Sequence, residues 1–291
     1  MGLIWELDFY SRPILDENGK KLWEVLICET PLGINTQADT LFRYTAECPG
    51  NQVNSIWLKQ TLQSAISEGG QKPEKIRFFR RSMANMITKA CNELDLPVAP
   101  SRRTYALHQW LKERTAQVYP AHPGFDATPT PAIQYGTDTP QSLPDALLGQ
   151  KWTFASLEIE AFQEMSEWDI GFGESFGLSM FNLDPGTLIP GVIIYSSRAM
   201  PLAGWMSGLE LAFLTINPNK VPQLLLETDL SNRWILANLN SKALDEEGQN
   251  FEAQKLQAAG IHFLAVQSNP KSESFAGFWL LQELREEGSR V

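Results

Sequence analysis

Hydrophobic and polar positions alternate at the start of the chain. Residues 4–10 follow a period of two, which is typical of a strand with one buried face, and the apolar positions are Trp5, Leu7 and Phe9. A denser apolar run covers 22–27, and Asn18-Gly19 supplies the positive φ angles that a tight reversal needs. Pro13 has no N–H for a strand ladder, so it predicts an edge or a bulge. The pattern predicts a β-hairpin that begins a sheet.

The rest of the first half alternates between strands and helices. We expect strands at 41–47 and 75–79, and helices from Asn54 or Ser55 to Gly69-Gly70, from a cap at Ser82 to about 94, and over 104–118. The order of strand, strand, strand, helix, strand, helix and helix resembles a ribonuclease H-like domain. Fold analogy alone implies no activity, because function depends on the site.

Residues 119–144 have a different composition, with six prolines spread among Gly, Thr, Asp and Gln. Such a stretch predicts a linker or an extended surface segment. We therefore expect an N-terminal α/β domain at 1–119, a Pro-rich linker at 120–150, and a C-terminal α/β domain at 151–291.

The second half again mixes strands and helices. The pattern predicts strands at 152–162, 192–195, 211–216, 223–227, 234–239, 261–266 and 275–281, and a helix at 198–209. Another helix, capped by Asp245, is expected to end at Gly260. The expected fold class is α/β (α+β), with two mixed-sheet domains.

Composition limits the classes of protein that fit. The 291 residues include 43% hydrophobic side chains, enough for full cores, and the formal net charge is −10. An acidic chain does not bind nucleic acid over its whole surface. The three cysteines, Cys28, Cys48 and Cys91, are far apart and form no metal motif, so we expect buried free thiols in a reducing compartment.

Three blocks of sequence carry a resemblance to a known family. The first is Trp5-Glu6-Leu7-Asp8-Phe9-Tyr10-Ser11-Arg12-Pro13 with the following Leu15-Asp16-Glu17-Asn18-Gly19-Lys20-Lys21-Leu22-Trp23-Glu24. The others, near the end, are Gly260-Ile261-His262-Phe263-Leu264-Ala265-Val266-Gln267 and Phe278-Trp279-Leu280-Leu281. The chain resembles the Tab/Atab family of cyanobacterial and chloroplast proteins over nearly its whole length.

This resemblance implies a function that composition and spacing do not show. It implies a non-enzymatic RNA-binding protein that promotes translation or biogenesis of photosystem reaction-centre subunits, chiefly those of photosystem I. The partner would be the 5′ untranslated region of a reaction-centre message. The absence of a leader rich in Arg and Ser leads us to expect a cyanobacterial cytoplasmic protein, for which the plastid stroma would be the plant equivalent. We expect no cofactor, no metal and no membrane insertion, because no apolar run approaches the length of a membrane span.

The basic segment at 72–114 is the candidate RNA site within an acidic chain. It holds ten basic and four acidic residues, or +6, which leaves −16 for the rest. Arg and Lys supply the phosphate affinity, and Phe78, Phe79, Tyr105 and Trp110 among them could stack bases or belong to the core. The predicted RNA-binding residues, with Arg12 added from the first strand, are Lys75, Arg77, Arg80, Arg81, Arg102, Arg103, Lys112, Arg114 and Arg12. The resemblance also implies a role in RNA association for Trp279, Leu280 and Leu281, which as a buried strand are expected to act mainly through packing.

Two other functions stay open at this stage. One is a divergent metal-dependent nuclease, which needs converging carboxylates. Asp8 could supply one, but Arg80-Arg81 follows the strand where a second acid would be required; Glu227 with Asp229 is another candidate, although Asp229 also suits a turn. The other is a protein-only photosystem assembly factor that docks through its acidic surface.

Overall fold

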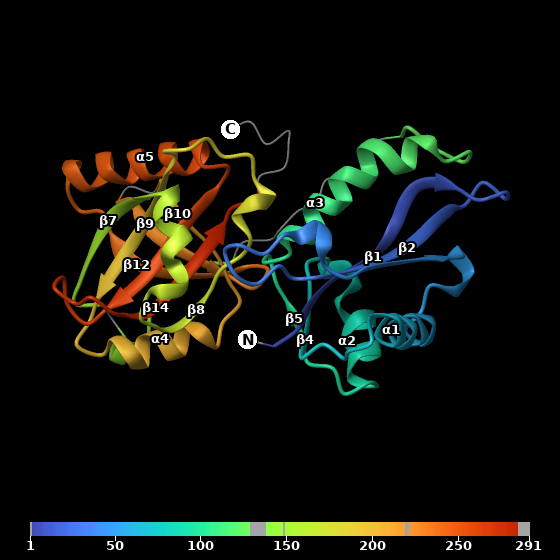
Figure 1. The fold of residues 1–291 in the computed structure, drawn as a ribbon, viewed down its shortest axis with the longest axis horizontal. Coiled ribbons are helices and arrows are strands. Elements are labelled where there is room, and N and C mark those ends of the chain that lie inside the picture. The colour runs from blue at the N-terminus through green and yellow to red at the C-terminus, as the bar shows by residue number, and fades with distance from the viewer. Residues whose placement is uncertain (1, 129–137, 148, 219–220, 285–291) are drawn as a thin grey trace. The chain divides into compact units, whose positions relative to one another are not determined.

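The computed structural model describes residues 2–128, 138–147, 149–218 and 221–284 (Figure 1). The chain forms two compact units, one of Met1–Pro31 with Gln37–Gln134 and the other of Leu32–Thr36 with Tyr135–Val291. Both units mix helices and strands, so the predicted α/β class with mixed sheets is confirmed.

A five-stranded sheet in the order β3-β2-β1-β4-β5 organises unit 1. Its strands are β1 (Ile4–Leu15), β2 (Lys21–Glu29), β3 (Arg43–Cys48), β4 (Lys75–Phe78) and β5 (Val98–Pro100). The pairs β1–β2 and β2–β3 are antiparallel, whereas β1–β4 and β4–β5 are parallel. The hairpin is confirmed, with Gly19 at φ +72° in its turn and a register shift between Ser11 and Leu15, around Pro13. The ribonuclease H-like assignment stays a prediction.

Helices lie on both faces of this sheet (Figure 1). Helices α1 (Ser55–Gly69) and α2 (Ala84–Asn92) pack on the apolar face, where Trp5, Leu7 and Phe9 are buried. Helix α3 (Tyr105–Glu113) covers the other face and continues as a π-helical turn at Arg114–Val118, inside the predicted helix.

The predicted helix caps were right in one case and wrong in two. The Asn54 side chain accepts hydrogen bonds from the N–H groups of Ile56 and Trp57, which fits the predicted start of α1. Ser82 does not cap α2, because it lies in a 3-10 turn (Arg81–Met83) and Met83 precedes the helix. Asp245 does not cap its helix either: Ser241 accepts from the N–H of Leu244, so the helix begins one turn earlier.

Two sheets form the framework of unit 2. The five-stranded one, in the order β7-β9-β13-β14-β8, consists of β7 (Lys151–Glu158), β9 (Leu188–Tyr195), β13 (Ile261–Gln267), β14 (Phe275–Gln282) and β8 (Ile170–Glu174). The four-stranded one, in the order β10-β11-β12-β6, consists of β10 (Leu211–Asn217), β11 (Gln223–Thr228), β12 (Asn232–Asn238) and β6 (Gln141–Ser142). The strand predicted at 152–162 is shorter than expected, because a 3-10 helix, η7 (Ile159–Glu167), follows β7.

The main core of unit 2 joins both sheets to two helices, α4 (Ala199–Ser207) and α5 (Lys242–Gln257). Leu264 from β13, Leu226 from β11 and Leu202 from α4 are fully buried in it. On the opposite face of the five-stranded sheet, Phe263 and Phe278 stack with their centroids 5.2 Å apart. The five-stranded sheet is thus buried on both faces where β13 and β14 run side by side.

The Pro-rich segment is only partly described. Residues 129–137 and 148 of the predicted linker lie outside the described residues. Before the gap, Phe125 forms a bridge to Ile14 in unit 1; after it, Asp138 accepts a hydrogen bond of 2.8 Å from Ser231 in unit 2. The linker and the predicted domain limits stay predictions.

Candidate nucleic-acid interface

Asp8 is the centre of a buried ion-pair network in unit 1. Its side chain is fully buried on β1, and β4, the parallel neighbour of β1, leads directly into Arg80. Arg12 donates to Asp8 Oδ2 through Nη1 at 2.9 Å, and Arg80 donates to Oδ1 through Nε at 2.5 Å and to Oδ2 through Nη2 at 3.1 Å. A buried charge of this kind is stable only when it is paired and hydrogen-bonded.

The surroundings of Asp8 keep its carboxylate ionised. Burial alone would raise the pKa of Asp8, but the charges and hydrogen bonds of Arg12 and Arg80 hold that pKa below its ordinary value of 3.8. Both carboxylate oxygens accept from guanidinium groups, so a metal ion would have to displace an arginine to reach them.

Arg12 connects this carboxylate to a second one, Glu24 on β2. Arg12 Nε donates to Glu24 Oε2 at 2.9 Å, and the Tyr119 hydroxyl donates to the same oxygen at 2.7 Å. Arg114 pairs with Glu24 Oε1 and stacks over the Tyr119 ring at 5.3 Å. Arg12 is 3% exposed, so it lies inside this network rather than on the surface.

The network belongs to a charged layer beneath α3. Glu6 and Arg77 are paired in register on β1 and β4, and both are buried. Glu6 Oε2 accepts a hydrogen bond of 2.8 Å from the N–H of Leu107 on α3. One face of the sheet is therefore apolar and packed by α1 and α2, whereas the other carries charged side chains that α3 covers.

Most of the predicted RNA-binding arginines lie in or near this layer. Besides Arg12, Arg77, Arg102 and Arg103 are less than 10% exposed, and Arg103 stacks over the Tyr105 ring at 5.6 Å. Arg80 and Arg114 are half-buried and held by carboxylates. A phosphate could reach such a guanidinium only if the side chain left its present surroundings, so RNA contact by these residues stays a prediction.

The aromatic rings of the basic segment are also inside the protein. Phe78, Phe79, Tyr105 and Trp110 are each less than 9% exposed. Their burial agrees with the core alternative and not with exposed rings for base stacking. Tyr10, from the opening motif, is only half-buried and lies 4.0 Å beneath the Arg80 guanidinium.

Two exposed cations of the segment lie at α2, Arg81 in the 3-10 turn before it and Lys89 on the helix. Arg81 and Lys89 are exposed, and neither side chain has an ion-pair or hydrogen-bond partner among the residues that the structure describes. A shallow pocket of about 480 Å³ lies on this helix, lined by Asn85, Thr88, Lys89, Asn92 and Glu93. Of the other predicted residues, Lys112 is exposed and Lys75 is half-buried.

Sequence reasoning missed this pocket. Lys89 is one of the ten basic residues of the segment at 72–114 but does not belong to the predicted RNA-binding set, and neither do Asn85 and Asn92. The signal was present as spacings of four and three residues, from Asn85 to Lys89 to Asn92, which put these side chains on one face of a helix.

The closing motif of unit 2 is part of the core. Trp279 is 4% exposed and Leu280 and Leu281 are fully buried in β14. Trp279 and Leu281 join the main core, and Leu280 points to the other face of the sheet. These contacts agree with a packing role, and whether the motif touches RNA stays a prediction.

The second candidate nuclease site has structural partners of its own. Glu227 is 2% exposed and accepts a hydrogen bond of 2.7 Å from Arg233 Nε. Asp229 has φ +50° in the turn between β11 and β12, as its turn assignment predicts, and accepts from Asn232 at 2.8 Å. Among the described residues, no three His, Cys, Asp or Glu side chains form a group able to hold a metal ion.

Other side chains singled out in the sequence are structural. Cys28, Cys48 and Cys91 are free and buried, as predicted, and burial raises the pKa of Cys48 to about 11 and that of Cys91 to about 12. His262 is fully buried, and its Nε2 accepts from the N–H of Leu214 at 2.8 Å, which joins β13 to β10. No helix within the described ranges is long and apolar enough to span a membrane.

Comparison with known proteins identifies the class of this chain and then its family. Two family models of RNA-binding proteins match the chain. The model described as "RNA-binding protein Tab2/Atab2 N terminal" matches residues 4–114, and the model described as "RNA-binding protein Tab2/Atab2, C-terminal domain" matches residues 130–282. The chain belongs to the Tab2/Atab2 family of RNA-binding proteins, as the sequence blocks at its two ends indicate.

Two curated plant proteins support this assignment. The chain is 40% identical over 288 residues to the chloroplastic TAB2 homolog of Zea mays, an alignment that covers 96% of this chain and 71% of the maize protein. It is 39% identical over 287 residues to the chloroplastic TAB2 homolog of Arabidopsis thaliana, an alignment that covers 96% of this chain and 74% of the Arabidopsis protein. No solved structure matches the chain.

Proposed function

We propose that this protein is a non-enzymatic RNA-binding protein that promotes translation or biogenesis of photosystem reaction-centre subunits, chiefly those of photosystem I. It would hold the 5′ untranslated region of a reaction-centre message. Membership of the Tab2/Atab2 RNA-binding family supports the RNA partner. We further propose that it works in the cytoplasm of a cyanobacterium, the counterpart of the compartment in the names of its chloroplastic relatives.

The observation that carries the RNA contact is a pair of exposed cations, Arg81 in the 3-10 turn before α2 and Lys89 on α2. Arg81 and Lys89 have no side-chain partner among the described residues, so they can bind phosphate without first breaking an ion pair. We propose that Lys75 on β4 and Lys112 on α3 make further phosphate contacts. The remaining cations of the predicted set, Arg12, Arg77, Arg80, Arg102, Arg103 and Arg114, would shape the surface and contribute to its potential.

A titration of the full chain against fluorescein-labelled single-stranded RNA tests this contact. If about five phosphates are engaged, log affinity falls with log salt at a slope near −3.5. In Arg81→Gln/Lys89→Gln, two fewer phosphates would be neutralised, so we expect about tenfold weaker binding at 0.1 M salt and a slope about 1.4 less negative.

The matched control removes the same charge from the hairpin turn. Lys20 and Lys21 are exposed there, so Lys20→Gln/Lys21→Gln has the same net charge as the α2 variant. We expect the RNA affinity of the control to stay within about twofold of wild type, because salt screens the effect of charges distant from the RNA. Equal losses of RNA affinity in the two variants, or a wild-type affinity that does not change with salt, would contradict the proposed contact.

The non-enzymatic part of the proposal has its own support. Asp8 is held by Arg12 and Arg80, and Glu227 by Arg233, so neither carboxylate is arranged as a metal ligand with neighbouring acids. Incubating labelled RNA with the full chain and Mg²⁺ or Mn²⁺ tests it. Metal-dependent cleavage that disappears in Asp8→Asn, or in Glu227→Gln/Asp229→Asn, would contradict this part and favour a divergent nuclease.

A further inference from the structure

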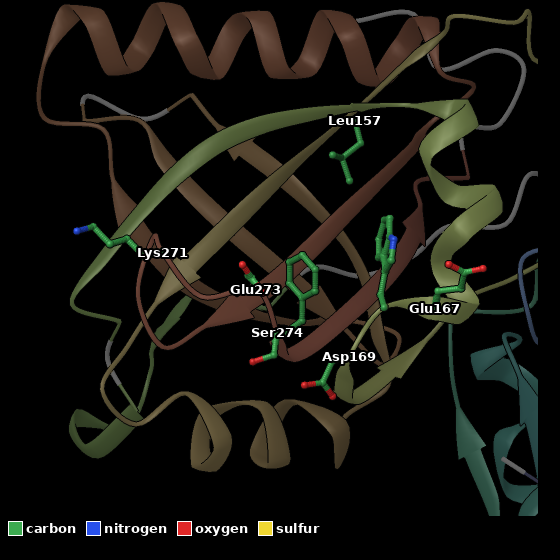
Figure 2. Close-up of a pocket in the computed structure, with 8 residues that line it drawn as sticks. Leu157, Glu167, Asp169, Lys271, Glu273 and Ser274 are labelled. Atoms are coloured by element: carbon green, nitrogen blue, oxygen red, sulfur yellow. The ribbon is translucent and has the colours of Figure 1, made fainter.

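Unit 2 contains a pocket of about 840 Å³ with an apolar floor and an acidic rim (Figure 2). Three segments line it: the end of β7, the stretch from η7 into β8, and the loop that leads into β14. The lining residues are Leu157, Glu167, Trp168, Asp169, Lys271, Glu273, Ser274 and Phe275. Its volume is within the range of pockets that bind ligands, roughly 300–1,000 Å³.

Two half-buried aromatic rings form the floor, and the core holds them in place. The centroids of Trp168 and Phe275 lie 5.8 Å apart. Both rings also contact Phe278, edge to face, at 5.3 Å, and Phe278 is fully buried. Neither ring can turn away without disturbing the core, so both present a fixed surface to the pocket.

Hydrogen bonds hold the loop that bears the rest of the wall. Gln267, itself 7% exposed, donates through Nε2 to the carbonyl oxygens of Ser272 at 3.0 Å and of Ser274 at 3.4 Å. The N–H of Phe275 donates to the Asp169 carbonyl at 2.8 Å and ties the loop to the start of β8. A wall formed in advance lowers the ordering cost of binding.

The charge of the pocket is negative. Glu167, Asp169 and Glu273 are exposed, and among the described residues none of their carboxylates has an ion-pair or hydrogen-bond partner. The one cation of the lining set, Lys271, lies apart from Glu167 and Asp169 (Figure 2). Three acids and one cation give −2, which attracts a cation and repels an RNA phosphate.

We propose that this pocket binds arginine side chains of a basic, extended segment in a protein partner. An arginine guanidinium stacks on aromatic faces and pairs with carboxylates through its planar fork of donors, and this pocket offers both kinds of contact. Trp168 and Phe275 would take the flat face of the guanidinium, and Asp169 and Glu273 would take its N–H groups. The proposal does not depend on RNA binding, which we assign to unit 1.

The test uses the full chain and a fluorescein-labelled peptide of sequence Gly-Arg-Gly-Arg-Gly, followed by fluorescence anisotropy. We expect binding that weakens as salt is added and that is lost with the Gly-Gln-Gly-Gln-Gly peptide. In Asp169→Asn/Glu273→Gln, which keeps the size of both side chains, we expect about tenfold weaker binding. In Trp168→Leu the stacking surface is lost, and we expect about fivefold weaker binding.

The control removes two acids elsewhere in unit 2. Glu246 and Glu247 are exposed on α5, outside the pocket, and Glu246→Gln/Glu247→Gln should bind the peptide within about twofold of wild type. The RNA affinity of Asp169→Asn/Glu273→Gln should not fall, which separates this proposal from the proposed RNA function. No peptide binding by wild type, or equal losses in the pocket variant and the control, would overturn the proposal.

Discussion

Replacing Asp8 by Asn tests the ion-pair network of unit 1. The carboxylate is fully buried and accepts three hydrogen bonds from Arg12 and Arg80. Asn keeps the size and one acceptor oxygen but removes the charge, and its amide group then faces guanidinium donors. Removing one partner of a buried ion pair typically costs about 3–5 kcal/mol. Because Glu24 still holds Arg12, we expect the lower end, a loss of about 3 kcal/mol in the free energy of unfolding.

Urea denaturation combined with hydrogen exchange measures this loss of stability in unit 1, where Asp8 lies. The chain forms two compact units, so exchange is followed in peptides from β1 and β2, and peptides from β13 and β14 of unit 2 serve as an internal reference. Asp39→Asn is the matched control, because Asp39 is exposed and should change stability by less than about 0.5 kcal/mol.

The pH dependence gives a second readout of the same change. The folded-state pKa of Asp8 is below its ordinary value of 3.8. Its contribution to stability is therefore present above that ordinary value and is lost as the pH falls through the folded-state pKa. The stability difference between wild type and Asp8→Asn should therefore be constant near pH 7 and shrink in acid. A loss under about 1 kcal/mol at pH 7, or a difference that grows in acid, would refute the reasoning.

Three further predictions concern other buried groups. Lys255 is fully buried, donates to Glu252 and to the Leu214 carbonyl, and pairs with Glu283. Lys255→Met should therefore destabilise unit 2 by about 2 kcal/mol in urea unfolding. An unchanged free energy of unfolding would show that these contacts make no net contribution to stability. Burial raises the pKa of Cys48 and Cys91, so an aromatic disulfide reagent at pH 8 should modify no thiol in the native protein and three after denaturation, and rapid native labelling would contradict the burial. Trp279→Ala should destabilise the chain by about 4 kcal/mol. RNA affinity lost without a change in stability would instead indicate direct contact by Trp279.

Local patterns in the sequence predicted the helices and strands well, because the conformation of each element depends largely on residues close to it in sequence. The alternation at Trp5, Leu7 and Phe9, the cap at Asn54 and the reversal at Gly19 all depend on residues close in sequence. The cap predictions at Ser82 and Asp245 were wrong because several Ser or Asp residues near a helix start can act as the N-cap. Ser82 instead lies in a 3-10 turn before α2, and Ser241, four residues before Asp245, caps α5.

The burial of the arginines could not be predicted in the same way. Arg77 alternates with Ile76 and Phe78 on β4, and this pattern only says that Arg77 belongs to the second face of the sheet. It does not say whether that face meets water or a helix. The cover is α3. The carboxylates that pair with Arg80 and Arg114 come from β1 and β2, 72 and 90 residues away in sequence.

Crosslinking of the full chain to RNA in cells, with sequencing of the bound RNA and of the crosslinked peptides, tests the central claim most directly. We expect peptides that carry Arg81 and Lys89 to be crosslinked, and the bound RNA to be enriched in leaders of photosystem reaction-centre messages. Crosslinks confined to peptides of unit 2, or no RNA recovered, would contradict RNA binding through Arg81 and Lys89.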